Sequence, residues 1–114
     1  MQLKTYTDGT LHVAELSGRF DAYEVPQFRE WLDPVLESEE PQILVNLSGV
    51  NFIDSQALAA LVRGMKRSRQ RGGNLRLCCL QQPVRIIFEL TRLDRAFDIA
   101  ESTGPVVDAG ATSS

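Results

Sequence analysis

Apolar and polar residues alternate near the start of the chain, in residues 3–7 and again in residues 11–16. Successive side chains of a strand point to opposite faces, so this period of two predicts two strands. Asp8-Gly9 lies between them, and this dipeptide favours hairpin turns. We therefore expect an N-terminal β-hairpin, whose second strand ends at residues 18–21.

The period becomes helical over residues 22–38, where apolar side chains recur every three or four positions. They are Val25, Phe28, Leu32, Val35 and Leu36. Pro26 suits a first helical turn, and Pro34 is expected to kink the helix or to mark its last turn. This pattern predicts an amphipathic helix packed on a sheet.

Residues 43–47 are almost continuously apolar, which is typical of a central parallel strand covered on both faces. A short loop, residues 48–53, is expected to follow and to end at Asp54-Ser55. A second helix then presents its apolar side chains on one side. These are Leu58, Leu61, Val62 and Met65.

Basic residues gather towards the end of this second helix, at positions 63, 66, 67, 69 and 71. Cations near a helix C-terminus complement the helix dipole, by about 0.3–1 kcal/mol each. A solvated helix end is the favoured interpretation, and a patch for an anion or a partner is the second.

Gly72-Gly73 ends the helix as a C-cap and turn, and residues 75–80 follow as a strand. Residues 84–90 are expected to form a third helix and residues 97–99 a last short strand. The order β-β-α-β-α-β-α-β predicts an α/β fold with a single mixed, largely parallel sheet of about 4–5 strands, covered on its faces by helices. Residues 1–101 are expected to form this domain and residues 102–114 a flexible C-terminal tail.

Composition narrows the functional classes. The chain has 114 residues, of which 43% are hydrophobic and 24% charged, with a net charge of -3. This acidic balance argues against nucleic acid as the main partner. No apolar run approaches the ~20 residues of a membrane span, and the start does not resemble a signal peptide, so the cytoplasm is the expected compartment. Cys78 and Cys79 are adjacent in a predicted strand, so we expect their side chains on opposite faces and no disulfide between them.

The residues required by the common catalytic sites are missing from the sequence. It has neither a Gly-x-Gly-x-x-Gly motif nor a phosphate loop ending in Lys-Ser/Thr, and it has no Gly-x-Ser-x-Gly elbow. The single histidine, His12, lies within a strand and has no nearby triad partners. Clusters with metal-ligand spacing are also absent. We therefore expect no enzymatic activity, cofactor or metal.

Asp54-Ser55 is the candidate site that remains. The simplest interpretation is that Asp54 or Ser55 caps the helix, which contributes about 1 kcal/mol. The dipeptide also follows the C-terminal end of a strand and opens a helix, where α/β folds often carry sites. A phosphoryl group on Ser55 would add about -1.5 to -2 charges at a helix N-terminus, which favours anions.

The run from Asn46 to Leu61 resembles the signature of STAS domains, in particular bacterial anti-sigma factor antagonists. The resemblance also includes residues 18–21 and the Gly72-Gly73 turn, and it covers roughly residues 3–101. It implies a partner switch. In this family, the unmodified antagonist binds an anti-sigma factor that is itself a serine kinase, the kinase phosphorylates the motif serine, and a PP2C-type phosphatase reverses the reaction.

Carried over by position, the resemblance implies that Ser55 is the phosphorylation site. It implies that partners bind a ridge formed by Asp21, Asp54, Ser55, Gln56 and Leu58. ATP and magnesium would belong to the kinase.

Three positions depart from the family pattern. Gln56 replaces Ser or Thr, Ala57 replaces Gly, and Asn46 replaces Asp. Ala57 adds a methyl group where a kinase approaches, and Asn46 removes a carboxylate from the neighbourhood.

Two other functions are compatible with the sequence. The chain could be a STAS interaction subunit that is never phosphorylated, as a lipid-transport accessory or a signalling scaffold. A more remote alternative is binding of a nucleotide or small ligand. A monomer or a weak dimer is expected.

Overall fold

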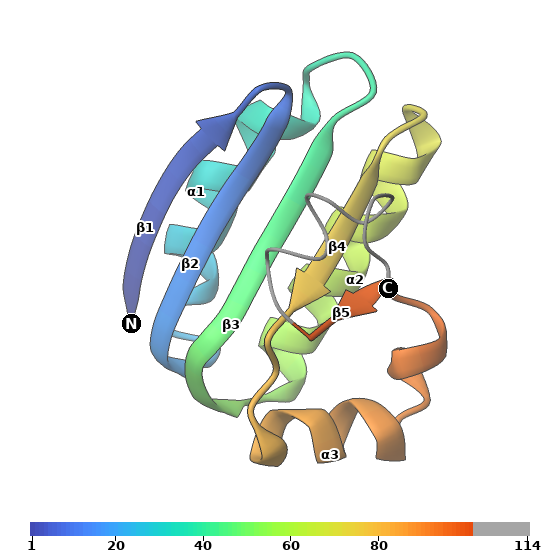
Figure 1. Ribbon diagram of the computed structural model, residues 1–114. Helices are drawn as coiled ribbons and strands as arrows, with labels where there is room; N and C mark the ends of the chain where they lie inside the picture. The colour runs from blue at the N-terminus through green and yellow to red at the C-terminus, as the bar shows by residue number, and fades with distance from the viewer. Residues whose placement is uncertain (102–114) are drawn as a thin grey trace.

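The computed structural model describes residues 1–101, which form five strands and four helical segments (Figure 1). The strands are β1 (Gln2–Asp8), β2 (Leu11–Phe20), β3 (Gln42–Ile53), β4 (Asn74–Cys78) and β5 (Ile99–Ala100). The helices are α1 (Val25–Leu36), α2 (Ser55–Gln70), α3 (Gln82–Leu90) and the short 3-10 helix η1 (Leu93–Arg95). The predicted tail, residues 102–114, lies outside the described residues.

The strands form one mixed sheet in the order β1-β2-β3-β4-β5. β1 pairs with β2 antiparallel through the predicted hairpin, and the other neighbouring pairs are all parallel. The predicted fold class and element order are therefore confirmed.

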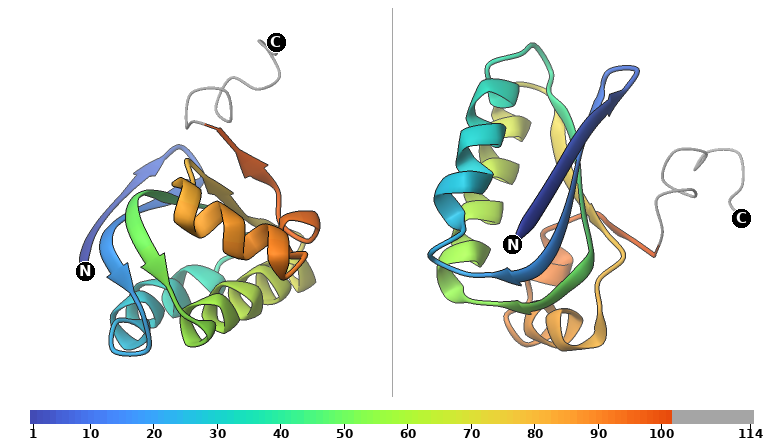
Figure 2. Two further views of the ribbon diagram at one scale, coloured as in Figure 1. Left: turned by 90° about the horizontal axis from the view of Figure 1, so that it is seen from below. Right: turned by 90° about the vertical axis from the view of Figure 1, so that its left-hand side faces the viewer.

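The sequence predicts helices on both faces of the sheet, but the structure has its two long helices on one face only. In the right-hand view of Figure 2, α1 and α2 lie on the same side of the sheet, and α3 lies at one end. Val84 and Phe88 of α3 belong to the same apolar core as the buried residues of α1 and α2. Within residues 1–101, the opposite face carries only a small buried cluster formed by Val13, Leu44 and Cys78. That cluster explains the continuous apolar run in β3, because Leu44 is buried there, away from the helices.

The expected loop at residues 48–53 is wrong, because β3 continues through it to Ile53. Val50 and Ile53 are buried there, and the segment pairs with the end of β2, with shifts in register. Gly49 allows this pairing, since a Cβ at this position would lie 2.6 Å from the Cβ of Ser17. Polar residues lie between the buried ones in this segment, so its sequence pattern resembles that of a loop. As a result, Asp54 is the only residue between β3 and α2.

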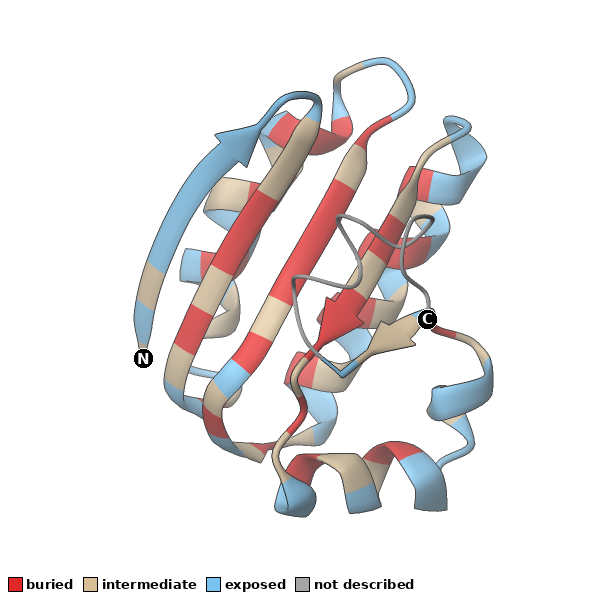
Figure 3. Cartoon of the chain, in the orientation of Figure 1, coloured by how far each residue is buried: buried red, intermediate tan, exposed pale blue. Residues whose placement is uncertain are grey.

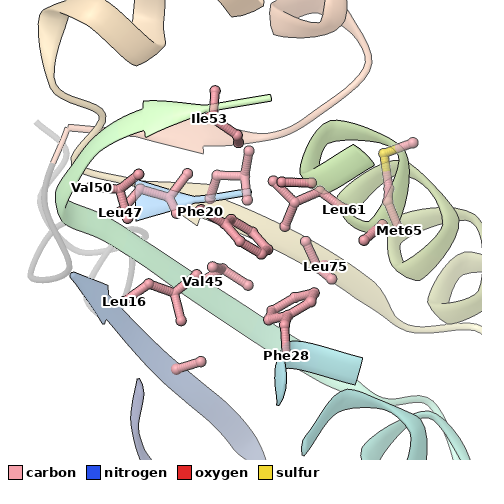
Figure 4. Packing of buried hydrophobic residues seen from close by; sticks show 14 of the residues in the cluster. Leu16, Phe20, Phe28, Val45, Leu47, Val50, Ile53, Leu61, Met65 and Leu75 are labelled. Atoms are coloured by element: carbon pink, nitrogen blue, oxygen red, sulfur yellow. The ribbon is translucent and has the colours of Figure 1, made fainter. Parts of the chain in front are cut away.

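The main core lies between the sheet and the helices, and the buried positions on β2, β3 and β4 are red in Figure 3. Phe20, at the end of β2, packs edge-on against Phe28 of α1 with ring centroids 5.2 Å apart. Leu61 and Met65 reach the same core from α2 (Figure 4). Complete burial of a large apolar side chain contributes about 1.5–3 kcal/mol, so this core fixes both helices against β2 and β3.

The helix ends follow the sequence signals. Pro26 is in the first turn of α1, as predicted. Pro34 is in the last turn, which is one of the two positions predicted for it, the other being a kink within the helix. Gly72 has a φ of +83°, a left-handed conformation that suits glycine just after the end of a helix.

Most of the basic cluster on α2 has a structural role. Arg71 donates hydrogen bonds to the carbonyls of Glu37 and Ser38, and Arg69 donates to the carbonyl of Ala96. Arg67 forms an ion pair with Asp33 at 3.4 Å. Arg63 and Lys66, nearer the middle of the helix, form no ion pair with any of residues 1–101.

The two cysteines are on the same side of the chain, contrary to the expectation for adjacent strand residues. Cys79 has a φ of +68°, which ends β4, and its side chain packs against the small cluster that contains Cys78. Both cysteines are free. Burial raises the pKa of the Cys78 thiol above its usual range, and the adjacent Cys79 raises it further. Cys78 is therefore a neutral core side chain at physiological pH.

Candidate functional site

Ser55 is the first residue of α2 and is exposed. The residue before it, Asp54, is the N-cap, with extended backbone, and its Oδ1 accepts a hydrogen bond of 2.9 Å from the Ala57 N–H. Of the two residues considered as the cap, Asp54 therefore has that role. The Ser55 hydroxyl is not required for the cap and lies at the positive end of a 16-residue helix.

Asp54 also connects α2 to the segment that follows β2. Its Oδ2 accepts a hydrogen bond of 2.9 Å from the Ala22 N–H, and its own N–H donates to the carbonyl of Phe20 at 3.3 Å. Phe20 and Ala22 are the two neighbours of Asp21. The structure thus places Asp21 beside Asp54 although they are 33 positions apart in the sequence.

The segment between β2 and α1 is itself well ordered by local contacts. Asp21 Oδ1 accepts a hydrogen bond of 3.1 Å from the Tyr23 N–H, and its Oδ2 lies 3.7 Å from Arg19 Nε. The Arg19 guanidinium also lies over the ring of Phe52, 3.9 Å from its centroid. The carboxylate of Asp21 is thus oriented by its neighbours, and its side chain is only 19% exposed.

An Asp54→Ala variant is expected to lose about 1–2 kcal/mol of the free energy of unfolding, because both the helix cap and the link to Ala22 disappear. Urea denaturation measures this loss, and hydrogen exchange should accelerate first at the Ala22 and Ala57 amides. Glu30→Ala, which removes an exposed carboxylate from α1, is the control and should change stability by less than about 0.5 kcal/mol. An Asp54→Ala variant as stable as this control would contradict the role assigned to Asp54.

The three departures from the family pattern lie in different surroundings. Ala57 is completely buried in the core, so its methyl group does not lie in the path of a partner. Gln56 is exposed next to Ser55. Asn46 alternates along β3 with the core residues Val45 and Leu47, so its side chain is on the face away from the helices. The sheet therefore separates the side chain at position 46 from α2, the helix that begins at Ser55.

Two features beside Ser55 were missed by the sequence analysis. Tyr23 is 90% exposed, directly after the residue that is bonded to Asp54. A mostly apolar groove of about 450 Å³ begins at Ser55 and follows the outer side of α2 towards η1. It is lined by Ser55, Leu58, Ala59, Val62, Arg63, Lys66 and Leu93. Leu58 and Val62, predicted on the same apolar side of the helix as Leu61 and Met65, are only partly buried. They pack against the main core and also line the groove. The helical spacing from Ser55 to Lys66 is the signal that could have revealed this stripe, whereas the wall at Leu93 depends on tertiary structure.

Two other features are absent from the part of the chain that the structure describes. Residues 1–101 contain no group of three or more His, Cys, Asp or Glu side chains that could hold a metal ion. The same residues include no helix that is long and apolar enough to cross a membrane.

Fold and site together define a mixed α/β domain that presents an exposed serine and two nearby carboxylates at the start of its second helix. The STAS domain family model matches residues 2–105, so the chain belongs to the STAS domain family. This finding confirms the resemblance carried by the sequence around Asp54-Ser55.

Individual relatives agree with the family assignment. The anti-sigma-B factor antagonist of Staphylococcus aureus (strain NCTC 8325) is 27% identical over 103 residues, which are 90% of this chain and 95% of that protein. An anti-sigma-factor antagonist (STAS) domain protein from Planctomyces limnophilus has a similar structure, with a TM-score of 0.85, 21% identity and coverage of 96% of this chain and 98% of that chain.

The anti-sigma factor antagonist SpoIIAA, a Bacillus cell fate determinant, is a further structural neighbour. Its unphosphorylated form has a TM-score of 0.81 at 18% identity and covers 98% of this chain and 100% of that chain. Its phosphorylated form has a TM-score of 0.76 at 17% identity and covers 95% and 98% of the two chains. At these identities the similarity demonstrates a shared fold.

Proposed function

We propose that this protein is an anti-sigma factor antagonist whose binding to its partner is controlled by phosphorylation of Ser55. In the unmodified state it binds an anti-sigma factor that is also a serine kinase, and the sigma factor is released. A PP2C-type phosphatase restores the unmodified state. The protein acts as a substrate and binding partner in this cycle, with no catalytic residues or cofactor of its own.

The observation that carries the proposal is the position of Ser55. Its hydroxyl is exposed at the N-terminus of α2, while Asp54 provides the cap. A kinase would transfer the γ-phosphoryl group of ATP to Ser55 Oγ, with loss of the hydroxyl proton and release of ADP. The product would place about -1.5 to -2 charges where the helix dipole favours an anion. The fold can therefore accept the modification without rearrangement.

The relatives support the same function. A curated relative of nearly the same length is an anti-sigma-B factor antagonist, and the structural neighbour SpoIIAA exists in phosphorylated and unphosphorylated forms. The proposed partner surface consists of Asp21, Asp54, Ser55, Gln56 and Leu58. Residues 1–101 are proposed as the STAS domain that carries this surface.

Phosphate mapping tests the proposal. The protein is incubated with each purified anti-sigma factor serine kinase of its own organism, together with ATP and magnesium, and the products are analysed by mass spectrometry. We expect one phosphate, on Ser55, which a purified PP2C-type phosphatase removes. Ser55→Ala should abolish the labelling, and Ser48→Ala, at another exposed serine, should not.

Two outcomes would contradict the proposal. Labelling at another residue would refute the assignment of Ser55. Absence of labelling with every such kinase, together with partner binding that neither Ser55→Ala nor Ser55→Asp changes, would favour the fixed STAS interaction subunit instead.

A further inference from the structure

The groove beside Ser55 has the length and the mostly apolar lining expected of a docking site for a helix. Its lining residues on α2 are Ser55, Leu58, Ala59, Val62, Arg63 and Lys66, at the spacing of one helical face. At 1.5 Å per residue, this face extends for roughly 16 Å, or about three turns. Leu93 of η1 forms the opposite wall, and the small side chain of Ala59 in the middle allows a partner to approach closely.

The backbone around the groove favours a helical occupant over an extended one. A bound strand gains affinity by pairing with free N–H and C=O groups at a sheet edge. Here the backbone beneath the groove belongs to α2, whose N–H and C=O groups beyond the first turn are hydrogen bonded within the helix. Recognition must therefore depend on side chains, as when an amphipathic helix places its apolar face in a groove.

The charges of the groove specify the occupant further. Arg63 and Lys66 are exposed at the end away from Ser55, and neither forms an ion pair with another of the described residues. The other cations of the basic cluster have partners, since Arg67 pairs with Asp33 and Arg69 and Arg71 bind backbone carbonyls. Asp94, which follows Leu93, is the acidic residue nearest to this wall in the sequence, and it forms no ion pair with Arg63 or Lys66. Two free cations at the end of an apolar groove complement carboxylates on a partner.

We infer that the groove between α2 and η1 binds an amphipathic helix of the partner protein, with apolar residues facing Leu58, Val62 and Leu93 and acidic residues facing Arg63 and Lys66. This inference rests on the proposed function, because the helix belongs to the anti-sigma factor. It extends the partner surface from the first turn of α2 to its third. Ser55 then lies within the docking site, so a phosphate would be added directly to its wall.

The test uses two synthetic 16-residue peptides with the same leucine face, one with glutamates and one with lysines at the flanking positions. Each is titrated into the isotope-labelled full chain and followed by nuclear magnetic resonance. We expect the acidic peptide to shift the amides of Leu58, Ala59, Val62 and Leu93 in a saturable manner. The basic peptide should bind at least about tenfold more weakly, since opposite charges favour and like charges oppose association.

A charge-reversed variant, Arg63→Glu with Lys66→Glu, should invert this preference. Lys4→Glu with Arg29→Glu makes the same change in net charge at exposed positions on β1 and α1 and should leave the preference unchanged. Sedimentation of the free chain shows whether it forms a dimer, and the dependence of the Leu58 and Leu93 amide shifts on protein concentration shows whether the dimer interface includes the groove.

Several results would overturn the inference. These are the absence of shifts at the groove, equal binding of both peptides, or a dimer whose interface includes Leu58 and Leu93. None of these measurements requires the kinase. Phosphorylation of Ser55 without peptide binding would therefore refute the groove alone. Peptide binding with no labelling of Ser55 by any of the kinases would count against the proposed function, and the preference of the groove for an acidic helix would still stand.

Discussion

A Ser55→Asp variant is expected to bind the anti-sigma factor at least about 100-fold more weakly than the unmodified protein, which corresponds to roughly 2.7 kcal/mol. The new carboxylate would lie at the start of an apolar groove, beside Asp21 and Asp54. Docking would have to remove water from this charge without supplying a partner, at a cost of about 2–5 kcal/mol. Calorimetric titration of the purified anti-sigma factor with each variant measures the effect.

The stability of the variant distinguishes a surface effect from damage to the fold. Because an aspartate in the first turn of α2 interacts favourably with the helix dipole, the melting temperature should be unchanged or slightly higher. Ser55→Ala should keep the affinity within about tenfold, since a hydrogen bond to a neutral group contributes about 0.5–1.5 kcal/mol. Ser48→Asp adds the same charge at another exposed position, on β3, and serves as the control. Unimpaired binding by Ser55→Asp would exclude Ser55 from the interface.

A Phe20→Ala variant is expected to lose about 3–5 kcal/mol of the free energy of unfolding, a large fraction of the 5–15 kcal/mol typical of a domain. Phe20 is completely buried, and its ring packs edge-on against Phe28. It lies at the end of β2, where its carbonyl accepts the hydrogen bond from Asp54. The substitution therefore leaves a cavity directly beneath the proposed partner surface.

Urea denaturation followed by circular dichroism measures the loss. Leu90→Ala removes a leucine that is 79% exposed on α3, and it should change stability by less than about 0.5 kcal/mol. If Phe20→Ala fails to fold, Phe20→Leu should show an intermediate loss, since it keeps part of the apolar volume. Equal stability of the Phe20→Ala and Leu90→Ala variants would contradict the packing described for the core.

The parts of the molecule that sequence analysis predicts well are those determined by local patterns. The period-two alternation and Asp8-Gly9 predict the hairpin, and the helical spacing of Leu61 and Met65 predicts the buried side of α2. The position of Ser55 at the start of a helix also follows from neighbouring residues, because an aspartate before a helical pattern is a common cap. These features need no knowledge of distant parts of the chain.

The features that were wrong or missed depend on residues far apart in the sequence. Residues 48–53 are a strand only because Gly18 to Phe20 of β2 pair with them. Leu58 and Val62 share the helical spacing of Leu61 and Met65, but they are only partly buried and line a groove whose other wall, Leu93, is distant in the sequence. The thiol of Cys79 changes sides because of a left-handed backbone conformation, which a strand pattern does not reveal.

The two hydrogen bonds accepted by the carboxylate of Asp54 have a consequence for folding. One bond, from Ala57, can form within an isolated helix, whereas the other, from Ala22, requires that β2 and β3 have already paired in register. The surface that contains Asp21 and Ser55 is therefore assembled only after two distant segments have met. A newly made or partly unfolded chain lacks this surface. A partner that contacts both Asp21 and Ser55 therefore binds only molecules that have completed folding.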